Sequence, residues 1–212
     1  MAIRIEECAS SDSKRRHFIV HLHGTEINVT VTANSSVVRK WISSTLYLRR
    51  HVLYCFVVGL GVQWTPGGRD APADVLQLCV GRRCLIFQLA HADYVPNALR
   101  KFLSDSRFTF VGFHNHSDRQ KLLISKHRLE MVKNPLDLRL SVESQDDEID
   151  LTSASVEKIV KECLGFDGVS LRREISMSDW DDEVLSNDQV LQACLDAHCA
   201  FEIGKNIKAW CI

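Results

Sequence analysis

The sequence predicts an α/β domain in which helices flank a mixed β-sheet. An unbroken apolar run over residues 54–60 is typical of a strand that is buried on both faces. Apolar residues alternate in segments 75–80 and 84–89, and the short turn at Gly81 between them predicts a β-hairpin. Segments with helical apolar spacing are interleaved with these strands, and this order indicates helices packed on the faces of a sheet.

The chain begins with a polar stretch that carries charges of both signs. We expect a flexible tail over residues 1–15 and a single domain over residues 16–212. The tail has no apolar core of the kind found in signal peptides, and no apolar run elsewhere is long enough to span a bilayer. The expected location is therefore the cytoplasm, with the nucleus as an alternative, and no membrane partner is expected.

The other elements are predicted by alternation, caps and breakers. Gly24 separates two alternating strands, and Asn34 begins an N-cap sequence. Pro96 suits the first turn of a helix, while Ser117 and Ser155 suit N-caps. We expect strands at 18–22, 27–31 and 108–113, helices at 35–46, 96–104, 118–127, 155–165 and 186–207, and a solvated acidic loop at 143–150.

The composition of the 212 residues is that of an ordinary globular protein. A net charge of −1 excludes a globally basic nucleic-acid-binding protein, although a local basic groove remains compatible with it. Most of the eight cysteines lie in apolar segments and none forms a CxxC pair, which favours reduced, buried thiols over disulfides.

Three motifs together resemble those of the ribonuclease-D and Werner-type 3′–5′ exonucleases of the DEDD superfamily. In that family, a central strand ends in Asp-x-Glu and an aromatic residue; here the strand reads Gly-Leu-Gly-Val-Gln-Trp from Gly59 to Trp64. The second motif matches the segment from Phe110 to Asp118, and the third matches the segment from Leu185 to His198. The resemblance implies a ribonuclease-H-like fold and metal-dependent hydrolysis of phosphodiester bonds.

The four carboxylates of the family fall on Gly61, Gln63, Asp118 and Asp196 in this chain, so only two acids remain. The family tyrosine that orients the attacking water falls on Gln192. Two-metal cleavage needs hard oxygen ligands that hold the ions about 3.5–4 Å apart. The resemblance therefore implies Mg²⁺ or Mn²⁺ that is bound weakly or with the help of substrate, or no ion at all.

The phrase Gly-Leu-Gly-Val-Gln-Trp-Thr-Pro-Gly-Gly and the short length resemble a plant subgroup of small exoribonucleases that clear fragments from the RNA-induced silencing complex. That resemblance implies single-stranded small RNA as substrate, silencing-complex proteins as partners, and a homo-oligomer, a hexamer in that subgroup. A neighbouring subunit could then supply the missing ligands. The residues alone favour a catalytically inactive binding or scaffold module, whereas the resemblance to the subgroup shifts the balance slightly to an exonuclease; RNA against DNA is left open.

Several residues near the motifs keep two interpretations. Trp64 could stack on a base or pack against the sheet edge. His114 and His116 alternate at a strand end, so we expect both on one face beside Asp118, as hydrogen-bonded rim residues that contact substrate rather than as metal ligands. The pairs Arg49-Arg50 and Arg172-Arg173 could neutralise phosphates along an RNA path or serve solubility alone.

Overall fold

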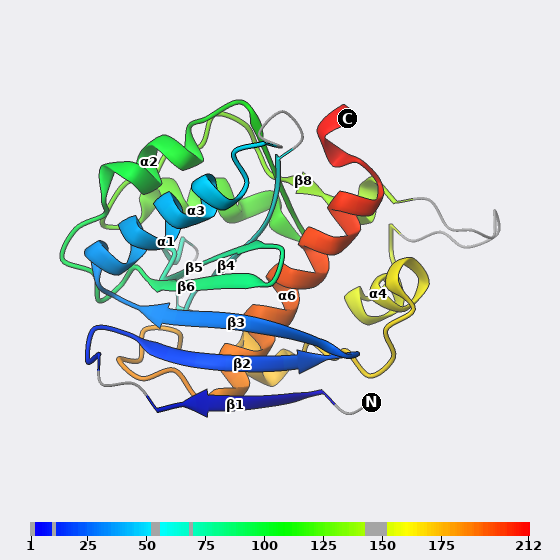
Figure 1. Cartoon of the computed structure of the whole chain (residues 1–212), viewed down its shortest axis with the longest axis horizontal. Coiled ribbons are helices and arrows are strands. Elements are labelled where there is room, and N and C mark those ends of the chain that lie inside the picture. Colours follow the sequence, from blue (N-terminus) through cyan, green and yellow to red (C-terminus); the bar gives the residue numbers. More distant parts are fainter. Residues whose placement is uncertain (1–2, 10–11, 52–55, 68–69, 143–151) are drawn as a thin grey trace.

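The computed structural model describes residues 3–9, 12–51, 56–67, 70–142 and 152–212. Within these ranges, eight strands form one mixed sheet in the order β1-β2-β3-β6-β5-β4-β7-β8 (Figure 1). The strands are β1 (Arg4–Cys8), β2 (Arg16–Leu22), β3 (Thr25–Thr32), β4 (Phe56–Gln63), β5 (Val75–Val80), β6 (Arg83–Gln88), β7 (Phe108–Gly112) and β8 (Leu136–Asp137). The helices are α1 (Ser35–Leu48), α2 (Asn97–Leu103), α3 (Asp118–Ile124), α4 (Val156–Leu164), α5 (Arg173–Ser176) and α6 (Asn187–Asn206).

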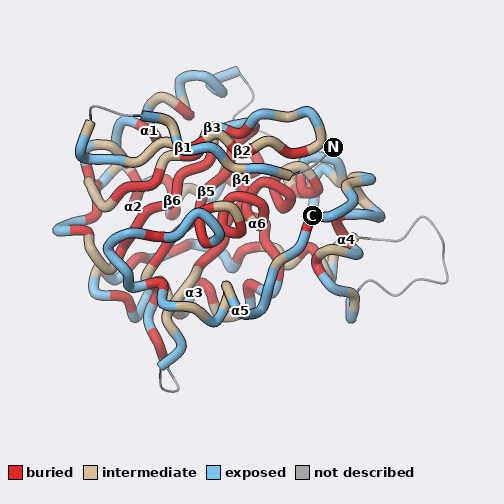
Figure 2. The backbone as a smooth tube through the Cα atoms, turned by 90° about the horizontal axis from the view of Figure 1, so that it is seen from below, coloured by how far each residue is buried: buried red, intermediate tan, exposed pale blue. Residues whose placement is uncertain are grey.

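Helices cover both faces of the sheet, as the sequence predicted. Arg83 and Cys84 are neighbours on β6 and point to opposite faces. The Arg83 guanidinium lies over the ring of Trp41 on α1, whereas the Cys84 thiol meets Cys194 on α6. Helix α6 crosses the central strands and is buried along most of its length, at the centre of the molecule in Figure 2.

The predicted central strand is covered on both faces. Strand β4 is buried from Phe56 to Val62, and β5 is buried throughout. The apolar run is therefore explained by contact with helices on both sides. Tyr54 and Cys55, the first residues of that run, lie outside the described residues. So does the predicted acidic loop at 143–150.

The prediction of a flexible tail over residues 1–15 is wrong for its middle part. Strand β1 pairs antiparallel with β2, from Arg4 opposite His21 to Cys8 opposite His17. The Arg16 guanidinium also donates to both carboxylate oxygens of Glu7, at 2.7 and 3.0 Å. A polar, charged sequence is compatible with an edge strand because backbone pairing does not require apolar side chains.

The helix ends agree with the predicted caps in most cases. The Asn34 and Ser155 side chains accept from backbone N–H groups at the starts of α1 and α4, and Gly165 ends α4 in the left-handed conformation. Helix α3 is shorter than predicted: the chain turns away at Ser125, where the Arg128 N–H donates to the Ser125 carbonyl. The Ser117 side chain makes no capping hydrogen bond.

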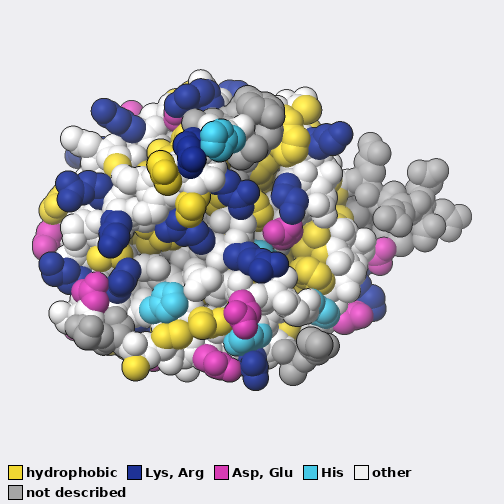
Figure 3. All heavy atoms as spheres, viewed as in Figure 1, with side chains coloured by type: hydrophobic (Ala, Val, Ile, Leu, Met, Phe, Trp, Pro, Cys, Tyr) yellow, Lys and Arg dark blue, Asp and Glu magenta, His cyan; other side chains and the backbone are white. Residues whose placement is uncertain are grey.

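The described helices include none that is long and apolar enough to cross a membrane. On the face shown in Figure 3, Lys and Arg side chains are spread among acidic and hydrophobic ones instead of forming one patch. This distribution agrees with the nearly neutral net charge.

Candidate functional site

A cavity of about 280 Å³ lies where β4 ends, between α3, α5 and α6. All of the predicted site residues except His116 line it. Its lining residues are Gly61, Val62, Gln63, Trp64, Phe113, His114, Asp118, Val156, Leu171, Ser176, Met177, Gln192 and Asp196.

The two remaining acids reach this cavity from different elements. Asp118 is the first residue of α3 and is buried, and Asp196 lies in the middle of α6. Burial and the charge of Asp196 raise the pKa of Asp118 well above the ordinary aspartate value. Burial raises the pKa of Asp196 to about 7. No described residue donates a hydrogen bond to either carboxylate, so both are free to bind a proton, water or a cation.

Gly61, where the resemblance places the first missing acid, is closely covered by other side chains. A Cβ atom at this position would lie 2.0 Å from Oε1 of Gln77 and 2.8 Å from Oδ2 of Asp196. Gln77 stands directly opposite Gly61 in the antiparallel β4–β5 pair. The space of the missing side chain is therefore filled by Gln77, which the sequence analysis did not identify. A polar residue inside the apolar run of β5 was the signal that could have found it.

Gln192, where the resemblance places a tyrosine, is used for structure. Its Oε1 accepts from the backbone N–H of Arg172 at 2.8 Å, and its Nε2 donates to the Arg172 carbonyl and to Oγ of Ser176. Because these three contacts engage both ends of the amide, Gln192 joins the α5 region to α6 and forms a wall of the cavity.

Trp64 lies at the rim, directly after the end of β4, with the ammonium group of Lys121 3.9 Å from its ring centroid. The same ammonium group donates to the Ala71 carbonyl at 2.9 Å. Trp64 therefore lines the cavity and also packs on a neighbouring side chain, so the two interpretations of this residue are compatible.

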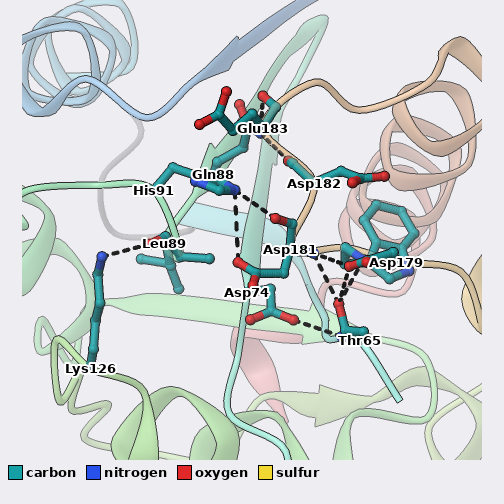
Figure 4. Close-up of polar contacts among 12 residues, drawn as sticks. Thr65, Asp74, Gln88, Leu89, His91, Lys126, Asp179, Asp181, Asp182 and Glu183 are labelled. Atoms are coloured by element: carbon teal, nitrogen blue, oxygen red, sulfur yellow. Dashed lines mark hydrogen bonds and ion pairs between the residues drawn. The ribbon is translucent and has the colours of Figure 1, made fainter. Parts of the chain in front are cut away.

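The next residue, Thr65, fixes the rim (Figure 4). Its hydroxyl donates to Oδ1 of Asp179 at 2.8 Å and accepts from the backbone N–H groups of Trp180 and Asp181. The Thr65 N–H donates to a carboxylate oxygen of Asp74 at 2.6 Å. These contacts attach the segment before α6 to the end of β4.

The prediction that His114 and His116 share one face is wrong. Strand β7 ends at Gly112, and His114 adopts a left-handed conformation with φ 50° before a 3₁₀ turn over Asn115–Ser117. The strand alternation therefore stops before both histidines. His114 lines the cavity, where partial burial and the charge of Arg139 lower its pKa; His116 does not line it.

The basic pairs do not converge on the cavity. Arg49 lines a separate cavity of about 720 Å³ with Arg82 and Lys205. The Arg172 guanidinium forms an ion pair with Asp188 at 2.5 Å, at the start of α6. The cavity at the end of β4 is therefore shaped mainly by aromatic, apolar and acidic groups.

The donor set suits one divalent ion better than two. Among the described residues, no group of three or more His, Cys, Asp and Glu side chains is placed to hold a metal. Asp118 and Asp196 together supply two negative charges, which balance one divalent cation, and amide oxygens are acceptable further ligands for a hard ion. The residues present therefore fit a single Mg²⁺ or Mn²⁺ ion and not the pair that four carboxylates would hold.

The raised pKa of Asp196 predicts a pH-dependent effect of Asp196→Asn on stability. The folded state holds the proton up to about pH 7, whereas an unfolded aspartate releases it near pH 4. Wild-type stability should therefore fall as the pH rises from about 4 to 7. We expect the free energy of unfolding of the asparagine variant to exceed that of the wild type by on the order of 2 kcal/mol at pH 8 and by little at pH 4. Urea unfolding in EDTA measures this, and Asp93→Asn, at an exposed position, is the control. An equal gain at both pH values would contradict the assignment.

Comparisons with known proteins agree with this geometry. A family of 3′–5′ exonuclease domains matches residues 69–210, a range that includes Asp118 and Asp196 and begins after Gly61 and Gln63. The chain is 28% identical over 184 residues to the exonuclease mut-7 homolog of Homo sapiens, which covers 74% of this chain and 21% of that protein. The chain spans less than half the length of the curated relatives that it matches.

Two solved structures share the fold at low sequence identity. The EXO domain of Aedes aegypti Nibbler superposes with a TM-score of 0.65 at 17% identity, over 85% of this chain and 87% of that one. RNase D of Escherichia coli, an exoribonuclease, superposes with a TM-score of 0.66 at 16% identity, over 87% of this chain and 45% of that one.

Proposed function

The chain belongs to the 3′–5′ exonuclease family, and on that premise we propose that it removes nucleotides from the 3′ end of single-stranded RNA. The main observation in support of the proposal is that Asp118 and Asp196 line the same cavity. The pKa values of both carboxyl groups are raised, and no described residue donates a hydrogen bond to either of them. A cavity of this size suits one terminal nucleotide better than a duplex.

The cavity walls supply contacts for a nucleotide. Trp64 and Phe113 offer aromatic surfaces on which a base can stack, a contact worth roughly 1–3 kcal/mol per base. Lys121, beside Trp64, brings a positive charge to the same rim. His114 is neutral at pH 7 because its pKa is lowered, so it can accept a hydrogen bond from a hydroxyl group of the sugar or donate one to a phosphate oxygen.

The family uses Mg²⁺ or Mn²⁺. A bound divalent ion would neutralise charge that develops on the phosphate during cleavage. Asp118 and Asp196 would hold it, and in its absence their ionised forms would repel the phosphate. Because only two carboxylates are available, we propose that the ion is single, weakly held and completed by the substrate or by a neighbouring subunit.

The test is turnover of 3′-labelled single-stranded RNA by the full chain with millimolar Mn²⁺. We expect Asp118→Asn and Asp196→Asn each to lower the rate at least about 100-fold, because each removes half of the anionic charge. Asp188→Asn, on the same helix as Asp196 but outside the cavity, should keep the wild-type rate. If both cavity variants cleave RNA at the wild-type rate, the reaction takes place elsewhere on the protein.

One observation favours a second function, a catalytically inactive module that binds RNA. Gln77 fills the space of the first missing carboxylate, so a single chain has no room there for a further charged ligand. In that case all variants should bind 3′-labelled RNA, Trp64→Ala should weaken binding, and no variant should cleave it. The substrate, the role in RNA silencing and the hexamer are proposals that rest on resemblance, and the cytoplasmic location is a proposal that rests on the polar start of the sequence.

A further inference from the structure

Gln77 has an environment that ordinary packing does not explain. The residue is 0% exposed, and neither Oε1 nor Nε2 of its side chain has a hydrogen-bond partner among the described residues. A buried polar group left in this state costs roughly 1–3 kcal/mol, whereas an apolar side chain of similar shape would cost nothing of this kind. A bound water or ion is one kind of partner that satisfies a buried amide of this kind.

The position of Gln77 indicates what that group is. Its Oε1 lies 2.0 Å from the point where Cβ of an acid at position 61 would stand, and Oδ2 of Asp196 lies 2.8 Å from the same point. The amide oxygen and the carboxylate oxygen therefore flank the place that the missing side chain of β4 would occupy. Two oxygen atoms turned to one place suit a positively charged species between or beside them.

We propose that Gln77 replaces the missing carboxylate of β4 and provides a neutral oxygen ligand, with Asp118 and Asp196, for one divalent cation. This inference deepens the proposed function and rests on it for the identity of the site, but not on turnover. An amide oxygen is a hard ligand that Mg²⁺ and Mn²⁺ accept. Because it carries no charge, it gives a weaker site than the carboxylate that it replaces.

Two substitutions of similar volume separate ligation from packing. Gln77→Met removes the oxygen and keeps the length of the side chain, so it should lower Mn²⁺ affinity about 10-fold. It should also raise the melting temperature in EDTA, because it removes the unsatisfied amide. Gln77→Glu adds one charge at the same place, so it should raise Mn²⁺ affinity at least about 10-fold.

The experiment is calorimetric titration of the full chain with MnCl₂, with the melting temperature recorded in EDTA and in Mn²⁺. In EDTA, the melting temperature of Gln77→Glu should be lower than that of the wild type, because three carboxylates then repel one another. Mn²⁺ should raise the melting temperature of this variant more than that of the wild type or of Gln77→Met. Equal Mn²⁺ affinity in wild type and Gln77→Met would overturn the proposal. A wild type that binds no Mn²⁺ at about 10 mM, roughly tenfold above the dissociation constants of weak oxygen-ligand sites, would overturn it as well. If affinity follows residue 77 but no RNA is cleaved, the inference stands and the proposed hydrolysis fails.

Discussion

Restoring the family carboxylates with Gly61→Asp and Gln63→Glu is expected to fail as long as Gln77 is present. The new Cβ at position 61 would lie 2.0 Å from Oε1 of Gln77, far inside contact distance, and Gln77 is fully buried. The new acid would also join Asp118 and Asp196, whose pKa values are already raised. We expect the double variant to lose several kcal/mol of stability in EDTA, on the order of 3 kcal/mol.

Adding Gln77→Ala to the same variant should reverse the result. The shortened side chain vacates the space, and the site then holds four carboxylates, as in the family pattern. We expect Mn²⁺ affinity to rise at least about 100-fold over the wild type, with faster cleavage of 3′-labelled RNA. Calorimetric titration and urea unfolding of the wild type, the double variant and the triple variant measure the coupling between positions 61 and 77.

Gly61→Ala is the matched control for shape alone, because it adds the Cβ atom without the charge. It should destabilise the wild type and be tolerated once Gln77→Ala is present. If Gly61→Asp and Gln63→Glu raise Mn²⁺ affinity fully without any change at residue 77, then Gln77 does not occupy the ligand position and the interpretation of the site is wrong.

Gly59→Ala is expected to abolish the folded state or nearly so. A Cβ atom at Gly59 would lie 1.8 Å from the carbonyl oxygen of Ala197 and 2.9 Å from the backbone nitrogen of Phe201, both on α6. These are backbone atoms of the central helix, so relief requires β4 and α6 to separate. The expected cost is roughly 4 kcal/mol or more, against a total stability of about 5–15 kcal/mol for a domain.

The control for Gly59→Ala is Gly165→Ala. Gly165 has φ +68° and no atom within 4 Å of the added Cβ, so alanine there meets only backbone strain of about 1 kcal/mol. Urea unfolding followed by circular dichroism compares the two. A Gly59→Ala protein that unfolds at the same urea concentration as the Gly165→Ala protein would show that β4 and α6 are not in close contact.

The order of the elements was predictable because it depends on local patterns. The hairpin around Gly81, the N-cap at Asn34 and the N-cap of α4 at Ser155 each rest on a few neighbouring residues, and each is confirmed. The pairing of β1 was not predictable from its polar residues, because strand pairing is a property of two segments and not of one.

For the candidate site as well, some features follow from the sequence and others follow only from the tertiary structure. The sequence alone establishes that residues 118 and 196 are aspartates and that residues 61 and 63 carry no charge, because the identity of each residue suffices for that. The tertiary structure decides that Gln77 fills the space above Gly61, that Gln192 is engaged with Arg172 and Ser176, and that His116 does not line the cavity. These outcomes depend on strand register, on the approach of α6 to β4 and on the turn after β7, and no single segment of the chain contains that information.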